Sequence, residues 1–169
     1  VAQRGADGVG PAAGQRLRQD FPQVESSVYI LSSGPVIMRG GEALPTEDAF
    51  LVDNLFFDVL RFPLVQGDPR TALSQVNSVV LTETEARRVF GDEPAMGKTV
   101  TMVSRGVSND FRVTGIARDV PRNSHMRFSL VARFDPATYF ADTPDFMTTW
   151  GWQSGWYYFS LRPGTDPAA

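Results

Sequence analysis

The feature that most limits the fold is a series of short runs rich in β-branched and aromatic residues, separated by turns that contain Gly or Pro. Such runs favour strands, because these side chains pack well on a pleated surface. None approaches the roughly 18 consecutive apolar residues of a membrane-spanning helix. The expected strands are Val24–Met38, Ala49–Val52, Ser78–Leu81, Thr99–Val103, Phe111–Ile116, Met126–Phe134 and Trp156–Leu161.

Gly and Pro also predict where the strands break and turn. The pair Gly34-Pro35 interrupts the first run, and because Pro cannot donate to a strand ladder we expect a bulge or an edge position there. Arg39-Gly40-Gly41 predicts a hairpin turn. Turns are also expected at Gly67-Asp68-Pro69 and over Gly106–Asp110.

Helices are expected at few places. Residues Pro11–Phe21 predict one, with Ala13, Leu17 and Phe21 on a single face at a spacing of four. Proline is tolerated in its first turn, and Pro22 follows its last residue. The segment Asp135–Gly155 reads as an irregular loop with some helix.

Two further helices carry signals at their N-termini. Asp53 is expected to cap a short helix over Asn54–Leu60. Thr82 and Glu85 have the spacing of a capping box, which predicts a helix over Thr84–Phe90 that ends at Gly91.

Composition excludes several classes of protein. Hydrophobic residues make up 42% and charged residues 21% of 169 residues, values typical of a chain that folds in water. The net charge of −3 argues against a nucleic-acid partner, because counterion release needs clustered Lys and Arg. The absence of Cys excludes disulfides and thiol nucleophiles, and it suits an extracytoplasmic bacterial domain that avoids mispairing.

One loop superficially resembles a phosphate-binding loop. In Gly91–Thr99 the two glycines are separated by five residues, whereas a Walker A motif has four. Pro94 lacks a backbone donor, and Asp92 and Glu93 would repel a phosphate. The expected structure is therefore a turn from a helix to a strand.

The remaining candidates for chemistry are weak. His125 follows Ser124, but neighbours on an extended segment point apart, and no G-x-S-x-G elbow exists. The acidic residues match no metal-binding motif, and Glu83 and Glu85 suit a helix N-terminus. We therefore assign no catalytic, cofactor-binding or metal-ligating residue and predict no cofactor.

Aromatic residues are dense near the C-terminus. They could form a platform for a sugar or peptide in a stand-alone periplasmic ligand-binding module, although core packing with a partly exposed interface explains them better. A hydrolase that uses Ser124 or another Ser with His125 is a third alternative. The aromatic residues are Trp150, Trp152, Trp156, Tyr157, Tyr158 and Phe159.

The order of short motifs along the chain carries a resemblance. The motifs are Asp53-Asn54-x-Phe56-Phe57-x-Val59, Phe62-x-Leu64-x-x-Gly67-Asp68, Asn77-Ser78-Val79-Val80-Leu81-Thr82-Glu83, Phe90-Gly91, Met96-Gly97-Lys98, Phe111-x-Val113-Thr114-Gly115-Ile116, Asp119-x-Pro121-x-Asn123-Ser124-His125 and Leu161-x-Pro163-Gly164-Thr165-Asp166. Together they resemble the MacB-like periplasmic core domain of MacB/FtsX-type ABC transporter permeases. The resemblance covers about Asp53 to Phe128 and Tyr157 to Pro167.

The resemblance implies an α+β fold in two parts. A porter-like α/β subdomain, split in sequence, would comprise residues 11–52 and 156–169 after a flexible lead-in over residues 1–10. An inserted β-rich, sabre-like subdomain would comprise residues 53–155. Related domains continue into a helix after the Pro-Gly-Thr-Asp-Pro turn, whereas this sequence stops at Ala169. We therefore expect the apolar surface on which that helix would dock to be exposed.

The resemblance also implies a function and partners. The domain would lie between the first two membrane helices of a bacterial inner-membrane permease, on the extracytoplasmic (periplasmic) side. It would be non-catalytic and would relay motion driven by a cytoplasmic ABC ATPase in a separate subunit or domain. A permease dimer and a periplasmic adaptor or substrate protein are the other implied partners.

Overall fold

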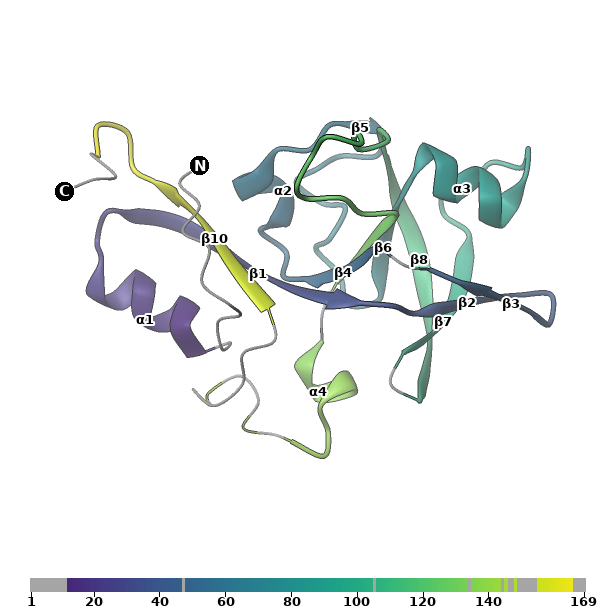
Figure 1. The fold of residues 1–169 in the computed structure, drawn as a ribbon, viewed down its shortest axis with the longest axis horizontal. Coiled ribbons are helices and arrows are strands. Elements are labelled where there is room, and N and C mark those ends of the chain that lie inside the picture. Colours follow the sequence, from purple (N-terminus) through teal and green to yellow (C-terminus); the bar gives the residue numbers. More distant parts are fainter. Residues whose placement is uncertain are drawn as a thin grey trace.

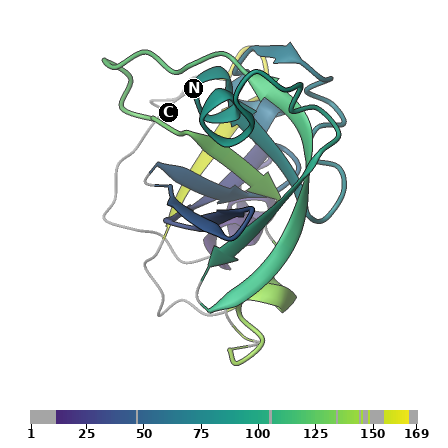
Figure 2. The ribbon, with the colours of Figure 1, turned by 90° about the vertical axis from the view of Figure 1, so that its right-hand side faces the viewer.

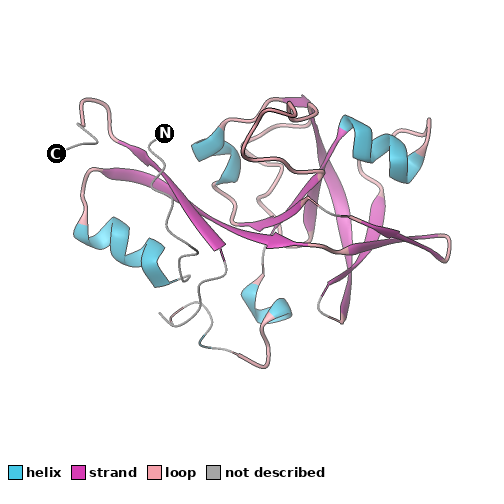
Figure 3. Ribbon diagram, viewed as in Figure 1, coloured by secondary structure: helices cyan, strands magenta, loops and turns pink. Residues whose placement is uncertain are grey.

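The computed structural model describes residues 12–46, 48–104, 106–133, 135–143, 145, 148 and 155–165, which form one mixed sheet with short helices around it (Figures 1 and 3). The order of the strands along the sheet is β10-β1-β4-β9-β6-β8-β7-β2-β3, and β5 pairs with β8. The strands are β1 (Val24–Ser33), β2 (Val36–Arg39), β3 (Glu42–Pro45), β4 (Ala49–Val52), β5 (Leu64–Gln66), β6 (Ser78–Thr82), β7 (Thr99–Ser104), β8 (Val107–Ala117), β9 (Leu130–Arg133) and β10 (Gly155–Leu161). The helices are α1 (Ala12–Asp20), α2 (Phe56–Leu60), α3 (Glu83–Phe90) and α4 (Pro136–Tyr139).

The Gly34-Pro35 break decides how the sheet curls. β1 pairs with β10 and β4 near one end of the strand order, whereas β2 pairs with β7 and β3 near the other end. Because β1 and β2 are consecutive in the chain, the sheet has to curl back on itself, as Figure 2 shows. The Ser33 and Ser104 hydroxyls meet at 3.1 Å across this closure. Gly34 and Pro35 lie between β1 and β2, and neither strand is at an edge of the sheet, so the expected edge position is wrong. The one register shift in the pairing of β1 lies near Val24, away from this pair.

The molecule extends to one side of the curled part. There β10 and the first half of β1 form a two-stranded layer, with α1 on one side and α2 on the other (Figure 1). The β2–β3 hairpin and α3 lie at the opposite end of the long axis.

Two buried clusters cover the two faces of the sheet, and β1 contributes to both. Tyr29 and Leu31 belong to one cluster, whereas Val28 and Ile30 belong to the other. Alternation along the strand explains this division, because successive side chains point to opposite faces. The layer of β1 and β10 therefore shares its core with the curled part of the sheet.

Phenylalanine rings dominate the second cluster. Phe56 of α2 is fully buried, and its ring centroid lies 5.1 Å from that of Phe57, 5.7 Å from Phe62 and 5.9 Å from Phe128. Rings at such separations add stabilisation beyond the area that they bury. This cluster fixes α2 between β1, β10 and the curled sheet.

The predicted helices α1, α2 and α3 are present, but some of their limits and caps differ from the prediction. α1 is confirmed, but Phe21 lies just beyond it and is 52% exposed, so the predicted apolar face is wrong there. α2 begins at Phe56 with Leu55 as its N-cap, and Asp53 instead accepts a hydrogen bond from the Leu55 N–H at 2.9 Å. α3 has Thr82 as its N-cap and Gly91 as its C-cap, as the sequence predicts.

The predicted strands are confirmed except at their limits, but β3 and β5 are not among them, and the run Val24–Met38 forms two strands, β1 and β2. Gly40 and Gly41 form the hairpin turn, with φ of 55° and 89°. The predicted turn over Gly106–Asp110 is too long, because β8 begins at Val107, which pairs with Ser104. β9 begins at Leu130 and not at Met126, and Phe134 lies outside the described residues.

The predicted division into a porter-like and an inserted part stays a prediction. Strand pairing is continuous across its boundary, since β4, assigned to the first part, lies between β1 and β9. No helix within the described residues combines the length and apolar character needed to span a membrane.

Candidate coupling surface

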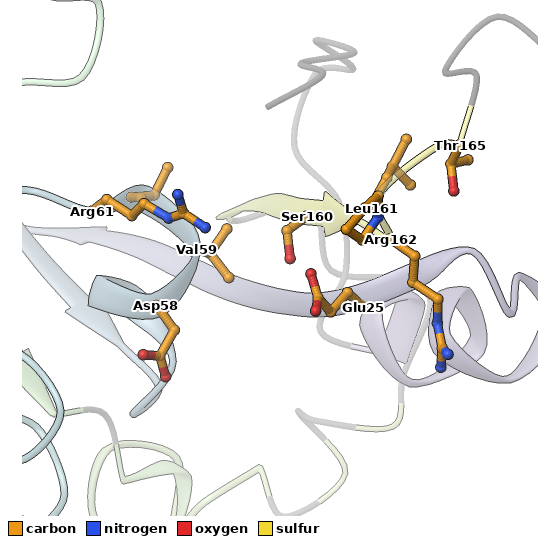
Figure 4. Close-up of a pocket in the computed structure, with 10 residues that line it drawn as sticks. Glu25, Asp58, Val59, Arg61, Ser160, Leu161, Arg162 and Thr165 are labelled. Carbon is orange, nitrogen blue, oxygen red and sulfur yellow. The ribbon is translucent and has the colours of Figure 1, made fainter.

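A groove of about 610 Å³ lies where the end of α2 faces the paired ends of β1 and β10 (Figure 4). Arg61, the residue after α2, and Glu25 of β1 point into it from opposite walls, and Ser160 of β10 lies beside Glu25. Arg162 is turned away from Arg61. The full lining comprises Glu25, Asp58, Val59, Leu60, Arg61, Ser160, Leu161, Arg162, Pro163 and Thr165.

The formal charges of the groove cancel. Glu25 and Asp58 are acidic, Arg61 and Arg162 are basic, and none of the four forms an ion pair with another described residue. The groove therefore favours neither anions nor cations. It offers hydrogen-bond donors and acceptors at the paired ends of β1 and β10.

Asp53 joins this layer to the start of α2. One carboxylate oxygen accepts the Leu55 N–H at 2.9 Å, and the other accepts the Tyr29 N–H of β1 at 3.2 Å. The pairing of β1 with β4 begins one residue later, at Ile30. Asp53 thus supplies an acceptor to β1 where β4 ends, a role that the predicted N-cap only partly captures.

A second polar cluster fixes α3 to the connection after β3. The Arg88 guanidinium donates to Glu85 at 2.6 and 2.8 Å and to the Thr46 hydroxyl at 3.0 Å. Glu85 is 5% exposed. Its carboxylate does not complete the predicted capping box, because the Thr82 N–H donates to the Ser129 carbonyl instead.

Asp119 lies at the N-terminal end of α3. It accepts hydrogen bonds from the N–H and the hydroxyl of Thr84 at 2.9 and 2.7 Å. Burial alone would raise the pKa of Asp119, but these hydrogen bonds and that from Thr82 lower it overall. This arrangement stabilises the helix start, where a negative charge is favourable.

The predicted turn at Gly91–Thr99 connects α3 to β7 and does not form a phosphate cradle. The Lys98 ammonium contacts the Glu93 carboxylate and lies 5.2 Å from the centre of the Phe90 ring. The Gly97 N–H donates to the Val113 carbonyl at 2.8 Å. These contacts occupy the groups that would bind a phosphate.

Ser124 and His125 do not form a dyad. The Ser124 hydroxyl bonds to the N–H and the carbonyl of Met126 at 3.2 and 3.1 Å, and His125 is exposed. Within the described part of the chain, no group of three or more His, Asp or Glu side chains could hold a metal ion.

The aromatic residues of β10 face opposite sides of the sheet and so do not form one platform. Tyr158 packs in the cluster around Phe56, whereas Tyr157 packs against the other cluster. Trp156 is 42% exposed. Trp150 and Trp152 lie outside the described residues.

Comparison with solved structures identifies the fold. A domain described as part of a permease from Porphyromonas gingivalis has a TM-score of 0.74 at 19% identity, covering 96% of this chain and 73% of that one. The periplasmic region of MacB from Actinobacillus actinomycetemcomitans has a TM-score of 0.64 at 18% identity, with 98% and 70% covered. The extracellular domain of the noncanonic ABC-type transporter YknZ from Gram-positive bacteria has a TM-score of 0.63 at 13% identity, with 95% and 76% covered.

Comparison of sequences gives the family. No curated protein matches this chain significantly. Residues 2–169 match the family described as the MacB-like periplasmic core domain, a longer stretch than the motifs alone covered. The chain therefore belongs to the MacB-like periplasmic core domain family and is an extracytoplasmic domain of an ABC transporter permease of the MacB/FtsX type.

Proposed function

We propose that this domain relays motion driven by a cytoplasmic ABC ATPase to the periplasmic side of the membrane. The observation that carries the proposal is the path of β1 and β2. These strands run from the layer with α1 and β10 into the curled sheet, and both faces of β1 are buried in cores shared with that sheet. A domain packed in this way moves as a unit, because a close-packed protein interior has low compressibility.

The proposal includes the partners implied by the family. The ATPase acts through membrane helices that flank the domain, the permease functions as a dimer, and a periplasmic adaptor or substrate protein receives the motion. The division into a porter-like part (residues 11–52 and 156–169) and an inserted part (residues 53–155) belongs to this proposal. The domain itself contributes contacts and rigidity, and hydrolysis takes place in the separate ATPase.

Distance measurements between spin labels test the relay. The chain contains no Cys, so labels can be placed at exposed sites at opposite ends of the long axis of the molecule, with Asp20→Cys at the last residue of α1 and Glu42→Cys in the β2–β3 hairpin (Figure 1). The full-length permease, with cysteines elsewhere replaced, is reconstituted with its ATPase. Nucleotide should change the Glu42–Glu42 distance between protomers and leave the Asp20–Glu42 distance within a protomer unchanged.

A variant of the core then tests coupling. Phe56→Leu loosens the cluster that joins α2, β1 and the curled sheet, and should reduce the displacement while ATP hydrolysis continues. Phe21→Leu, the same change at an exposed Phe, is the matched control. A wild-type permease whose Glu42–Glu42 distance ignores nucleotide would refute the proposed function.

A further inference from the structure

The helix α1 contacts the sheet where its backbone at Gly14 meets the aromatic ring of Tyr157. A β-carbon placed on Gly14 would lie 2.1 Å from Cε1, 2.4 Å from Cζ and 2.6 Å from the hydroxyl oxygen of Tyr157. β-Carbons are essentially never found this close to another heavy atom, so any larger residue at position 14 would force the helix or the ring to shift.

The ring of Tyr157 in turn contacts the core. Its centroid lies 5.0 Å from that of Tyr29, which is 3% exposed and belongs to the same cluster as Leu31 and Leu51. Tyr29 is confined on another side by Gly155, where a β-carbon would lie 2.6 Å from its ring. Gly14, Tyr157 and Tyr29 therefore form a continuous line of contact from α1 to the core, named here the tyrosine bridge.

Gly14 is the only buried position among residues 14, 16, 17, 19 and 20, the part of α1 whose burial the structure describes. Leu17 is only half-buried, Phe21 is 52% exposed, and the Arg16–Asp20 ion pair is on the surface. Exposed ion pairs contribute little to stability. Among these described positions, the tyrosine bridge is therefore the buried contact between α1 and the sheet.

We infer that Tyr157 is a positioning residue: it fixes α1 against β10 and carries a displacement of α1 through Tyr29 into the core. This inference rests on the proposed function for the source of the displacement. The seating of α1 is independent of that function and can be measured without nucleotide.

The variants isolate the ring contact. Tyr157→Ala removes the ring, Gly14→Ala forces the helix and the ring apart, and Tyr157→Phe keeps the ring without its hydroxyl. Trp156→Ala is the matched control, since it truncates an exposed aromatic residue of the same strand on the opposite face. All are made in the full-length, reconstituted permease that carries the spin labels described above.

Seating of α1 is read from the Asp20–Glu42 distance within a protomer. We expect Tyr157→Ala and Gly14→Ala to broaden or shift this distribution, and Tyr157→Phe and Trp156→Ala to leave it as in the wild type. A distribution for Tyr157→Ala that matches the Trp156→Ala control would overturn the tyrosine bridge, whatever the permease does with nucleotide.

Transmission is read from the Glu42–Glu42 distance between protomers. We expect Tyr157→Ala to reduce the nucleotide-dependent change at least twofold while ATP turnover stays within twofold of wild type, and Tyr157→Phe to retain the change. A wild-type change that persists in full in Tyr157→Ala would refute transmission through Tyr157 and leave the proposed function intact. If nucleotide does not change the Glu42–Glu42 distance even in the wild type, the proposed function fails, and transmission through Tyr157 fails with it. The Asp20–Glu42 distance still decides whether Tyr157 positions α1 on the sheet.

Discussion

At the scale of single residues, the pair of Glu85 and Arg88 offers an asymmetric test. The Glu85 side chain is 6% exposed, whereas that of Arg88 is 35% exposed and can reach water. Arg88→Ala leaves a buried carboxylate without its partner and should cost about 3 kcal/mol of unfolding free energy. Glu85→Ala should cost less, about 1–2 kcal/mol, because the freed guanidinium can be solvated.

Urea unfolding of the two single variants and of the double variant measures this difference. The double variant should lose less stability than the sum of the single variants, since each removes the same interaction. Equal losses for Arg88→Ala and Glu85→Ala would contradict the interpretation that burial of the carboxylate dominates.

The buried phenol of Tyr139 should make the folded state less stable at alkaline pH. Burial raises its pKa to about 12, against a smaller lowering by a hydrogen bond to Asn109. An unfolded Tyr ionises near pH 10, so the folded state holds the proton more tightly. This contribution is complete below about pH 10 and is lost as pH rises from about 10 through 12.

Tyr139→Phe should therefore remove part of the alkaline loss, up to about 2 kcal/mol between pH 9 and 12. Unfolding free energies at several pH values measure the effect. Burial also raises the pKa of Tyr158, so Tyr158→Phe should remove a separate part. A Tyr139→Phe profile that overlays the wild type would show that the phenol is solvated.

At the scale of elements, the end of α2 carries local strain. Arg61, its C-cap, has φ 51°, a left-handed conformation that costs a residue with a β-carbon about 1 kcal/mol relative to Gly. Arg61→Gly should raise the unfolding free energy by about 0.5–1 kcal/mol, whereas Arg61→Ala keeps the strain and should not. Thermal unfolding of the two variants decides the matter: equal midpoints would show that the strain is relieved elsewhere.

The elements themselves were largely predictable, because their signals are local. The Thr82 cap, the Gly91 helix end and the Gly40-Gly41 turn depend on a few neighbouring residues, and the structure has all three. Element limits failed where a distant partner decided them. Asp53 lies two residues before Leu55, the N-cap of α2, and one of its carboxylate oxygens serves Tyr29 of β1, 24 residues away in the chain.

The candidate site was less predictable than the fold. Glu25 and Arg61 are ordinary surface charges in the sequence, and only the pairing of β1 with β10 brings Glu25 beside the end of α2. Gly14 carries no signal either. Its importance depends on Tyr157, which lies on a strand near the other end of the chain.

At the scale of the whole molecule, the shared cores predict a single unfolding transition. All three Trp residues lie between positions 150 and 156, so Trp fluorescence reports the region that leads into β10. Far-ultraviolet circular dichroism reports the entire sheet. Because β1 is buried on both faces in cores common to both parts, the two signals should lose half their amplitude at the same urea concentration.

A fluorescence transition at lower urea than the circular dichroism transition would show that the β1–β10 layer unfolds separately. Phe56→Ala tightens the test, because the loss of a fully buried ring should cost about 3–5 kcal/mol and shift both transitions together. A shift in only one signal would contradict a shared core.

The sequence by itself determined most of the strands and turns, the α3 caps and, through the order of its motifs, the family. These depend on short-range preferences and on spacings that a chain carries with it. Only the tertiary structure decided that Gly34-Pro35 closes a curled sheet, that four charged residues line one groove, and that α1 rests on Tyr157. Each of these is a contact between distant segments, and its free energy exists only when packing has brought both partners together.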